Sequence, residues 1–149
     1  DALQAIFLAH YEKHIADFSR PYPGLIAQLD RLQADGHRLA VCTNKLEAYA
    51  RLLLDELGLT HRFAAITGGD SFAFKKPDRR HLEETIRLAG SGPAIMVGDS
   101  RTDVDTARNA GIPVIGVSFG YTDVPMKDLR PDVLIEHFDE LAGAIARID

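Results

Sequence analysis

Short, continuous apolar runs separated by helical patterns are the feature that most limits what this chain can fold into. The runs do not alternate apolar and polar residues, and uninterrupted apolar runs are typical of strands that are covered on both faces. Strand–helix alternation of this kind predicts an α/β fold, a parallel sheet with helices on both sides. The predicted strands span residues 39–42, 64–66, 94–97, 114–117 and 133–135. The predicted helices beside them span residues 45–57, 79–89, 101–110 and 137–148.

The first part of the chain has a different pattern. Residues 2–18 carry apolar side chains at three- and four-residue spacings, which predicts an amphipathic helix. Two prolines and a glycine in residues 19–24 end it, because proline and glycine make a continued helix costly. A second helix is expected from Leu25 to about Gly36.

Composition excludes several classes of protein. The 149 residues suit one domain, and no apolar run approaches the ~20 residues that span a bilayer. A net charge of −5 argues against nucleic acid as a partner, since phosphate backbones are held by clustered Lys and Arg. The single cysteine, Cys42, cannot form an internal disulfide and fits a reducing compartment. We therefore expect a cytoplasmic protein without a membrane span, in which Cys42 is an inert core residue.

Small, hydroxylic and acidic residues follow the predicted strands, where parallel sheets bind their ligands. Asp99 lies between a glycine and the helix-capping Ser100, and a carboxylate at this edge is a hard oxygen ligand suited to Mg²⁺. Asp103 has the spacing of a capping box with Ser100. The sequence therefore predicts a metal role for Asp99 and explains Asp103 by local structure.

Thr43 and Asn44 leave two interpretations open. Asn44 with Glu47 has capping-box spacing, whereas a free helix N-terminus beside a hydroxyl can hold a phosphate group. Lys76 stands in the chain's one basic cluster, residues 75–80, which is large enough for a single phosphate. Paired lysines in a loop are usually solvated, but Pro77 restricts the backbone of Lys76.

These residues resemble the motifs of a known family. Thr43-Asn44, then Lys76-Pro77, then the stretch from Met96 to Asp103 resemble motifs two, three and four of the haloacid dehalogenase superfamily, in the family's order. Residues 7–24 look like the end of the helical cap of phosphoglycolate phosphatases. The resemblance implies a Rossmann-like core over residues 21–149 and, over residues 1–20, the end of a cap with its return linker.

The resemblance also implies a mechanism. Family members hydrolyse phosphomonoesters with Mg²⁺ through an aspartyl-phosphate intermediate. For this chain the resemblance implies a small phosphorylated metabolite such as 2-phosphoglycolate as the substrate. Thr43 and the backbone of Asn44 would hold the phosphoryl oxygens, Lys76 would neutralise charge and Asp99 would bind Mg²⁺. Asp103 would orient Lys76 or the loop around Asp99.

The chain departs from the family at motif one, the Asp-x-Asp pair that supplies the nucleophile. The family's first strand lies between the strands that end before Thr43 and Asp99, so we expect a sheet without its usual central strand. Such a chain either pairs its inner strands or takes a strand from another molecule, and we expect it to be inactive alone. A sugar-phosphate phosphatase and a non-catalytic fragment or assembly module are the alternatives, and the oligomeric state is open.

Overall fold

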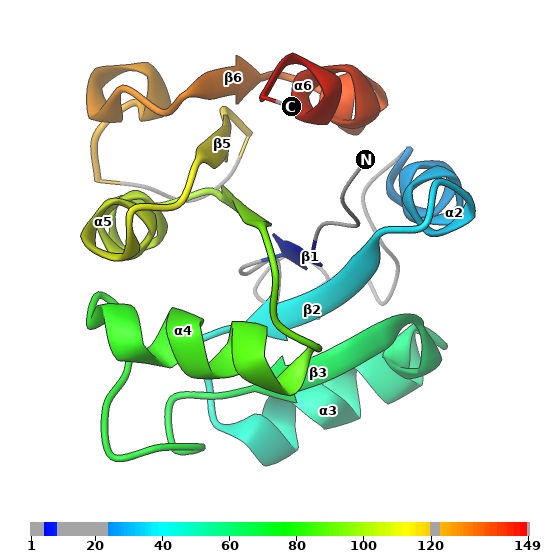
Figure 1. The fold of residues 1–149 in the computed structure, drawn as a ribbon, viewed down its shortest axis with the longest axis vertical. Coiled ribbons are helices and arrows are strands. Elements are labelled where there is room, and N and C mark those ends of the chain that lie inside the picture. The colour runs from blue at the N-terminus through cyan, green and yellow to red at the C-terminus, as the bar shows by residue number, and fades with distance from the viewer. Residues whose placement is uncertain (1–4, 9–23, 120–122, 149) are drawn as a thin grey trace.

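The centre of the protein is a six-stranded sheet in which all neighbouring strands are parallel, in the order β3-β2-β1-β4-β5-β6 (Figure 1). The structure, a computed structural model, describes residues 5–8, 24–119 and 123–148. The strands are β1 (Ala5–Leu8), β2 (Arg38–Cys42), β3 (Phe63–Thr67), β4 (Ala94–Gly98), β5 (Val114–Val117) and β6 (Val133–Ile135).

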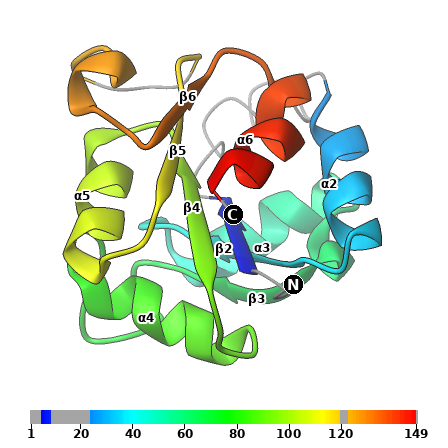
Figure 2. The ribbon, with the colours of Figure 1, turned by 45° about the horizontal axis from the view of Figure 1, so that its top comes forward.

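Helices cover both faces of this sheet (Figure 2). They are α2 (Leu25–Ala34), α3 (Glu47–Glu56), α4 (Arg79–Leu88), α5 (Arg101–Ala110) and α6 (Leu141–Ile148). Side chains of α2, α3 and α6 pack on one face, and those of α4 and α5 pack on the other. The sequence prediction of an α/β fold with helices on both sides is thus confirmed, and each predicted element from residue 25 onward is present.

Alternation along β2 explains why both faces need a helical cover. Leu39 and Val41 point to the face of α2 and α3, whereas Ala40 and Cys42 point to the face of α4 and α5. All four are apolar, so neither face can be left in water. Burying one aliphatic side chain stabilises the fold by about 1.5–3 kcal/mol, which makes the two-sided core the main stabilising feature of the protein.

The expected helix over residues 2–18 is wrong at Ala5–Leu8, because these residues form β1 in the middle of the sheet. The expectation of a missing central strand is wrong for the same reason. Parallel hydrogen bonding to β2 on one side and β4 on the other pairs backbone groups that would otherwise be buried without partners. A short apolar run cannot be assigned to helix or strand by its spacing alone, and here tertiary pairing decides.

Because the chain's own residues fill this position, β1 takes the place that a strand from another molecule would occupy. The predicted cap-to-core boundary near residue 20 lies outside the described residues. Within the ranges that the structure describes, no helix has the length and apolar character needed to cross a membrane.

Candidate active site

The carboxyl ends of the parallel strands bring four predicted site residues to one edge of the sheet. Thr43 follows β2, Asp99 follows β4, Asp103 lies in the first turn of α5, and Lys76 comes from the loop between β3 and α4. Their exposed fractions are 0%, 2%, 1% and 4%, respectively. Buried polar and charged residues are unusual unless they are paired, so their meeting here marks this edge as the candidate site.

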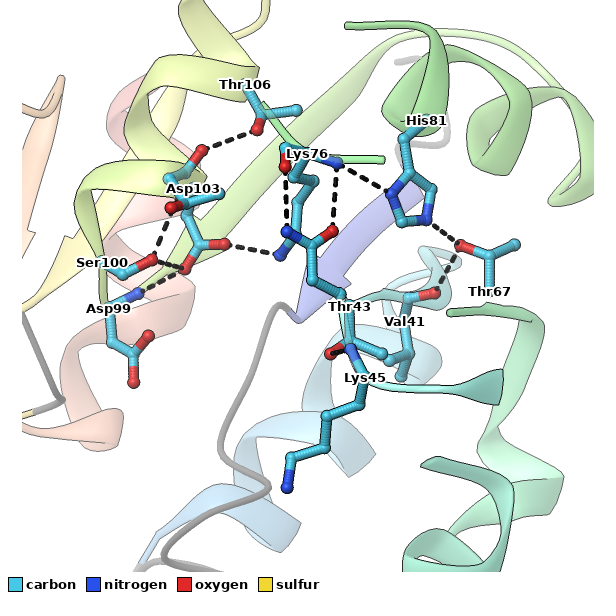
Figure 3. Close-up of polar contacts among 12 residues, drawn as sticks. Val41, Thr43, Lys45, Thr67, Lys76, His81, Asp99, Ser100, Asp103 and Thr106 are labelled. Carbon is cyan, nitrogen blue, oxygen red and sulfur yellow. Dashed lines mark hydrogen bonds and ion pairs between the residues drawn. The ribbon is translucent and has the colours of Figure 1, made fainter. Parts of the chain in front are cut away.

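Lys76 and Asp103 form a buried ion pair (Figure 3). Lys76 Nζ lies 2.7 Å from Asp103 Oδ1, and both side chains are almost fully enclosed. The second carboxylate oxygen of Asp103 accepts hydrogen bonds from the Asp99 N–H (3.0 Å) and from Ser100 Oγ (3.1 Å). Asp103 therefore joins the loop after β4 to the lysine from the loop after β3.

Gly98 makes this arrangement sterically possible. A Cβ atom at residue 98 would collide with the Cβ and carboxylate of Asp103. The absence of a side chain at this position lets Asp103 fold back over the end of β4 and reach the Asp99 N–H.

The backbone of Lys76 is held by the side chain of Asn44. Asn44 Nδ2 donates to the Lys76 carbonyl at 2.9 Å, and the Lys76 N–H donates to Asn44 Oδ1 at 3.0 Å. The predicted capping box of Asn44 and Glu47 is therefore wrong, because α3 starts later and has Leu46 at its N-cap without a side-chain cap. The side-chain amide of Asn44 thus binds the backbone of Lys76, which is distant in the sequence, and does not cap α3 as the spacing to Glu47 predicted.

A carboxylate from another loop caps α3 instead. Asp70 Oδ1 accepts a hydrogen bond of 2.8 Å from the Glu47 N–H. The Gly69 N–H donates to the Lys45 carbonyl at 2.6 Å, and no side chain would fit at Gly68 or Gly69 against this turn. The N–H of Glu47 is thus committed to Asp70, so a phosphate group near Thr43 would have to be held by the turn before α3.

Thr43 follows β2 and Asp99 follows β4, the two strands that lie on either side of β1. Thr43 Oγ1 accepts from the Lys45 N–H at 3.1 Å, which folds the turn back over the hydroxyl. The Asp99 carboxylate points away from Asp103 in Figure 3, whereas its N–H points toward it. Among the residues that the structure describes, no three His, Cys, Asp or Glu side chains gather into a metal-binding group. Asp99 fits Mg²⁺ as one carboxylate ligand, which suffices where phosphate and water complete the coordination.

A pocket of about 210 Å³ opens beside the ion pair. Its lining comes from the loop after β2, from Lys76 and from the start of α5, namely Asn44, Lys76, Ser100, Thr102 and Asp103. Thr102 is not among the residues predicted for the site, although its position in the first turn of α5 was a usable signal. The pocket has room for a small polar ligand.

The basic cluster of residues 75–80 does not act as one unit. Lys76 is buried, whereas Lys75 is exposed and Arg80 pairs with Asp78 at 2.7 Å. Arg80 also lies over the Phe74 ring. The pairing with Arg80 lowers the pKa of Asp78 to about 2. Lys76 is thus the member of the cluster that contributes to the site.

His81 is a second residue that is absent from the predicted site. Its ring is fully buried between the Lys76 N–H, 3.2 Å from Nδ1, and Thr67 Oγ1, 3.1 Å from Nε2. Burial, together with the charge of Lys76, lowers the pKa of His81 to about 4. The available signal was the spacing of His81 and Thr85 on the buried face of α4.

Cys42 is buried nearby, and burial raises its pKa, as expected for an inert core thiol.

Comparison with known proteins places this geometry in a family. The family model described as haloacid dehalogenase-like hydrolase matches residues 1–117. A phosphoglycolate phosphatase of Mesorhizobium japonicum is 54% identical over 148 residues, and one of Agrobacterium fabrum is 55% identical over 147 residues. The matched regions cover 98% and 97% of this chain but 65% and 63% of those relatives. The chain thus spans about two thirds of the length of the relatives it matches.

Solved structures agree. A predicted phosphoglycolate phosphatase from Haemophilus somnus has a TM-score of 0.78 at 31% identity, covering 83% of this chain and 56% of that chain. A mutant of CbbY from Rhodobacter sphaeroides, in complex with xylulose-(1,5)bisphosphate, has a TM-score of 0.72 at 26% identity, covering 82% and 56%. From the family match and this shared fold we conclude that the chain belongs to the haloacid dehalogenase-like hydrolases.

Proposed function

We propose that the chain is the core of a Mg²⁺-dependent phosphomonoester hydrolase that acts through an aspartyl-phosphate when complete. The observation that carries this proposal is the buried ion pair of Lys76 and Asp103, next to Thr43 and Asp99 at the carboxyl edge of the sheet. A buried ammonium at this edge meets the main requirement of phosphoryl transfer, the stabilisation of charge that develops on the phosphoryl oxygens.

Each residue has a role that its surroundings support. Lys76 neutralises charge on the phosphate and the nucleophile, and Asp103 fixes its ammonium from behind. The Thr43 hydroxyl and the Asn44 backbone bind phosphoryl oxygens, while the Asn44 side chain holds Lys76. Asp99 holds Mg²⁺, which supplies further positive charge when bound.

The proposed substrate is 2-phosphoglycolate or a similar small phosphorylated metabolite. The relatives named phosphoglycolate phosphatase support this choice. A sugar phosphate is the second candidate, favoured by the xylulose bisphosphate bound to the similar CbbY structure. The two candidates share the phosphoryl chemistry and differ in the group that must be recognised beyond the phosphate.

We further propose that residues 1–149 alone do not turn over. In the family the nucleophilic aspartate follows the first strand, whereas Ala9 and His10 follow Leu8 in this sequence. Purified residues 1–149 should release no phosphate from 2-phosphoglycolate with Mg²⁺. Release that depends on Mg²⁺ and disappears in Asp99→Ala would overturn this part of the proposal and would suggest that the chain supplies its own nucleophile.

A hybrid protein tests the activity itself. Residues 1–149 are joined to the part of the Mesorhizobium relative that lies outside the matched region, and hydrolysis of 2-phosphoglycolate and of sugar phosphates is measured with Mg²⁺. We expect hydrolysis, with a loss of roughly 10²–10³-fold in Lys76→Met, the size found when one charge-stabilising group is removed. Lys75→Met is the matched control, because this exposed neighbouring lysine should be replaceable without effect. A folded hybrid that hydrolyses neither substrate, or in which both variants behave alike, contradicts the proposal.

A further inference from the structure

His81 is a fully buried, titratable residue that the proposed mechanism does not use. It lies in α4, and its ring stands between the backbone of Lys76 and the side chain of Thr67 (Figure 3). A buried imidazole is costly unless both ring nitrogens have partners. The partners of the two ring nitrogens therefore indicate which groups the His81 ring positions.

The hydrogen-bond directions around the ring can be assigned from the donors. The Lys76 N–H can only donate, so His81 Nδ1 accepts and, in the neutral ring, Nε2 carries the proton. The Nε2–H group then donates a hydrogen bond to Thr67 Oγ1, 3.1 Å away. The Thr85 hydroxyl donates to the His81 carbonyl at 2.7 Å, which leaves its oxygen to accept from Thr67 at 2.7 Å. A longer alternative for the Thr67 proton is the Val41 carbonyl, 3.5 Å away.

The contacts thus form a directed chain from Lys76 through His81 and Thr67 to Thr85 and back to the His81 backbone. This chain requires a neutral ring, because a protonated ring would place an N–H against the Lys76 N–H. The depressed pKa of His81, about 4, agrees with a neutral ring at neutral pH. Networks of this kind are rigid when each member is satisfied.

Three elements together hold Lys76. The Asn44 side chain, in the loop after β2, hydrogen-bonds the carbonyl and the N–H of Lys76, and His81 of α4 accepts from the same Lys76 N–H. The first turn of α5 holds its ammonium through Asp103. Lys76 itself lies in a loop between β3 and α4, and a loop alone does not place a side chain with the accuracy that catalysis needs.

We propose that His81, supported by Thr67 and Thr85, is a positioning residue that sets where Lys76 presents its ammonium to a bound oxyanion. The inference rests on the proposed function of Lys76 and deepens it. His81 touches neither the phosphate nor the metal in the proposed mechanism, and it acts through the backbone of Lys76. Its replacement should therefore disturb Lys76 more than it disturbs Thr43 or Asp99.

The first test is spectroscopic and does not depend on ligand binding. In ¹⁵N-labelled residues 1–149, long-range ¹H–¹⁵N spectra report which ring nitrogen of each histidine is protonated, and the His81→Asn variant identifies the signals of His81. We expect a neutral ring protonated at Nε2 at neutral pH. A ring protonated at Nδ1, or a charged ring, would overturn the proposal.

The second test separates positioning from packing with two variants. An Asn side chain at residue 81 places an amide group near the position of Nδ1, whereas a Gln side chain places it near Nε2. We expect His81→Gln to shift the Lys76 amide signal and weaken binding of inorganic phosphate about fivefold, the loss of one hydrogen bond. His81→Asn should keep the Lys76 signal and the phosphate affinity within about twofold, although both variants lower Tm.

Equal effects of the two variants on Lys76 would show a packing role and overturn the proposal. If the wild-type chain binds no inorganic phosphate, the proposed phosphate site fails instead. The Lys76 amide signal still decides the role of His81 in that case, because it is measured without ligand. The failure of the proposed function and the failure of this inference are therefore distinguishable.

Discussion

The loops that follow β2 and β4 carry the same local pattern for starting a helix, and the structure uses them differently. After β4, Ser100 caps α5 by accepting from the Asp103 N–H, as the spacing predicts. After β2, Asn44 has the corresponding spacing to Glu47 but binds the backbone of Lys76, and Asp70 caps α3 in its place. A capping pattern in the sequence therefore produces a cap only where no residue distant in the sequence forms a more favourable hydrogen bond with that side chain.

The difference also separates two kinds of contribution to the site. The loop after β4 supplies charge through Asp99, and the first turn of α5, which follows it, does so through Asp103. The loop after β2 supplies hydrogen bonds that fix Lys76. Lys76 joins the two loops. Changes in the two loops should therefore differ in size, the charged side being the more costly to disturb.

The largest expected effect is on the β4 side. Asp103→Ala leaves the buried ammonium of Lys76 without its partner, and breaking a buried pair in this way costs about 3–5 kcal/mol. Urea unfolding measures the change in the free energy of unfolding. Arg87→Ala removes an exposed pair with Glu84 and is the matched control, expected to cost about 0.5 kcal/mol or less. Similar costs for both variants would mean that the Lys76–Asp103 pair is not buried as described.

The second effect comes from His81 and depends on pH. Its pKa falls from an ordinary 6.5 to about 4 in the folded protein, so the unfolded chain takes up the proton first as pH falls. The folded state should keep its full stability from this group above about pH 6.5 and lose on the order of 3 kcal/mol by about pH 4. Urea unfolding over this range checks the loss. The His81→Asn variant lacks the titrating ring and should show a smaller pH dependence. An unchanged dependence contradicts the assignment.

The smallest effect sharpens the comparison of the two loops. Asp70→Ala and Ser100→Ala each remove a helix cap and should each cost about 1 kcal/mol. A double-mutant cycle of Asn44→Ala with His81→Gln should show coupling of about 0.5 kcal/mol or more, because the Asn44 and His81 side chains share the Lys76 N–H and both variants give up that contact. The cycle of Asn44→Ala with Glu47→Ala should show almost none. Coupling of Asn44 to Glu47, with almost none to His81, would contradict this assignment and support the capping box of Asn44 and Glu47.

The sequence predicted the sheet from β2 onward because each strand there is an uninterrupted apolar run, a signal that does not depend on distant partners. It missed β1, where Ile6 and Phe7 also fit a helical spacing and pairing with β2 and β4 decides the outcome. It placed Thr43 and Asp99 on one edge, since parallel strands end together, whereas Lys76 and Asp103 were added to the site by the family resemblance alone. The roles of Asn44, His81 and Asp70 depend on contacts between separate loops, which local spacing cannot reveal.

The most direct test of the central claim is a titration of ¹⁵N-labelled residues 1–149 with inorganic phosphate, with and without Mg²⁺, followed by amide chemical shifts. We predict saturable shifts at the loops after β2 and β4 and at Lys76, with Mg²⁺ strengthening the binding and shifting Asp99 most. Shifts confined to the exposed basic residues Lys75, Arg79 and Arg80, or no saturable shifts, would contradict a phosphate site at the carboxyl edge of the sheet.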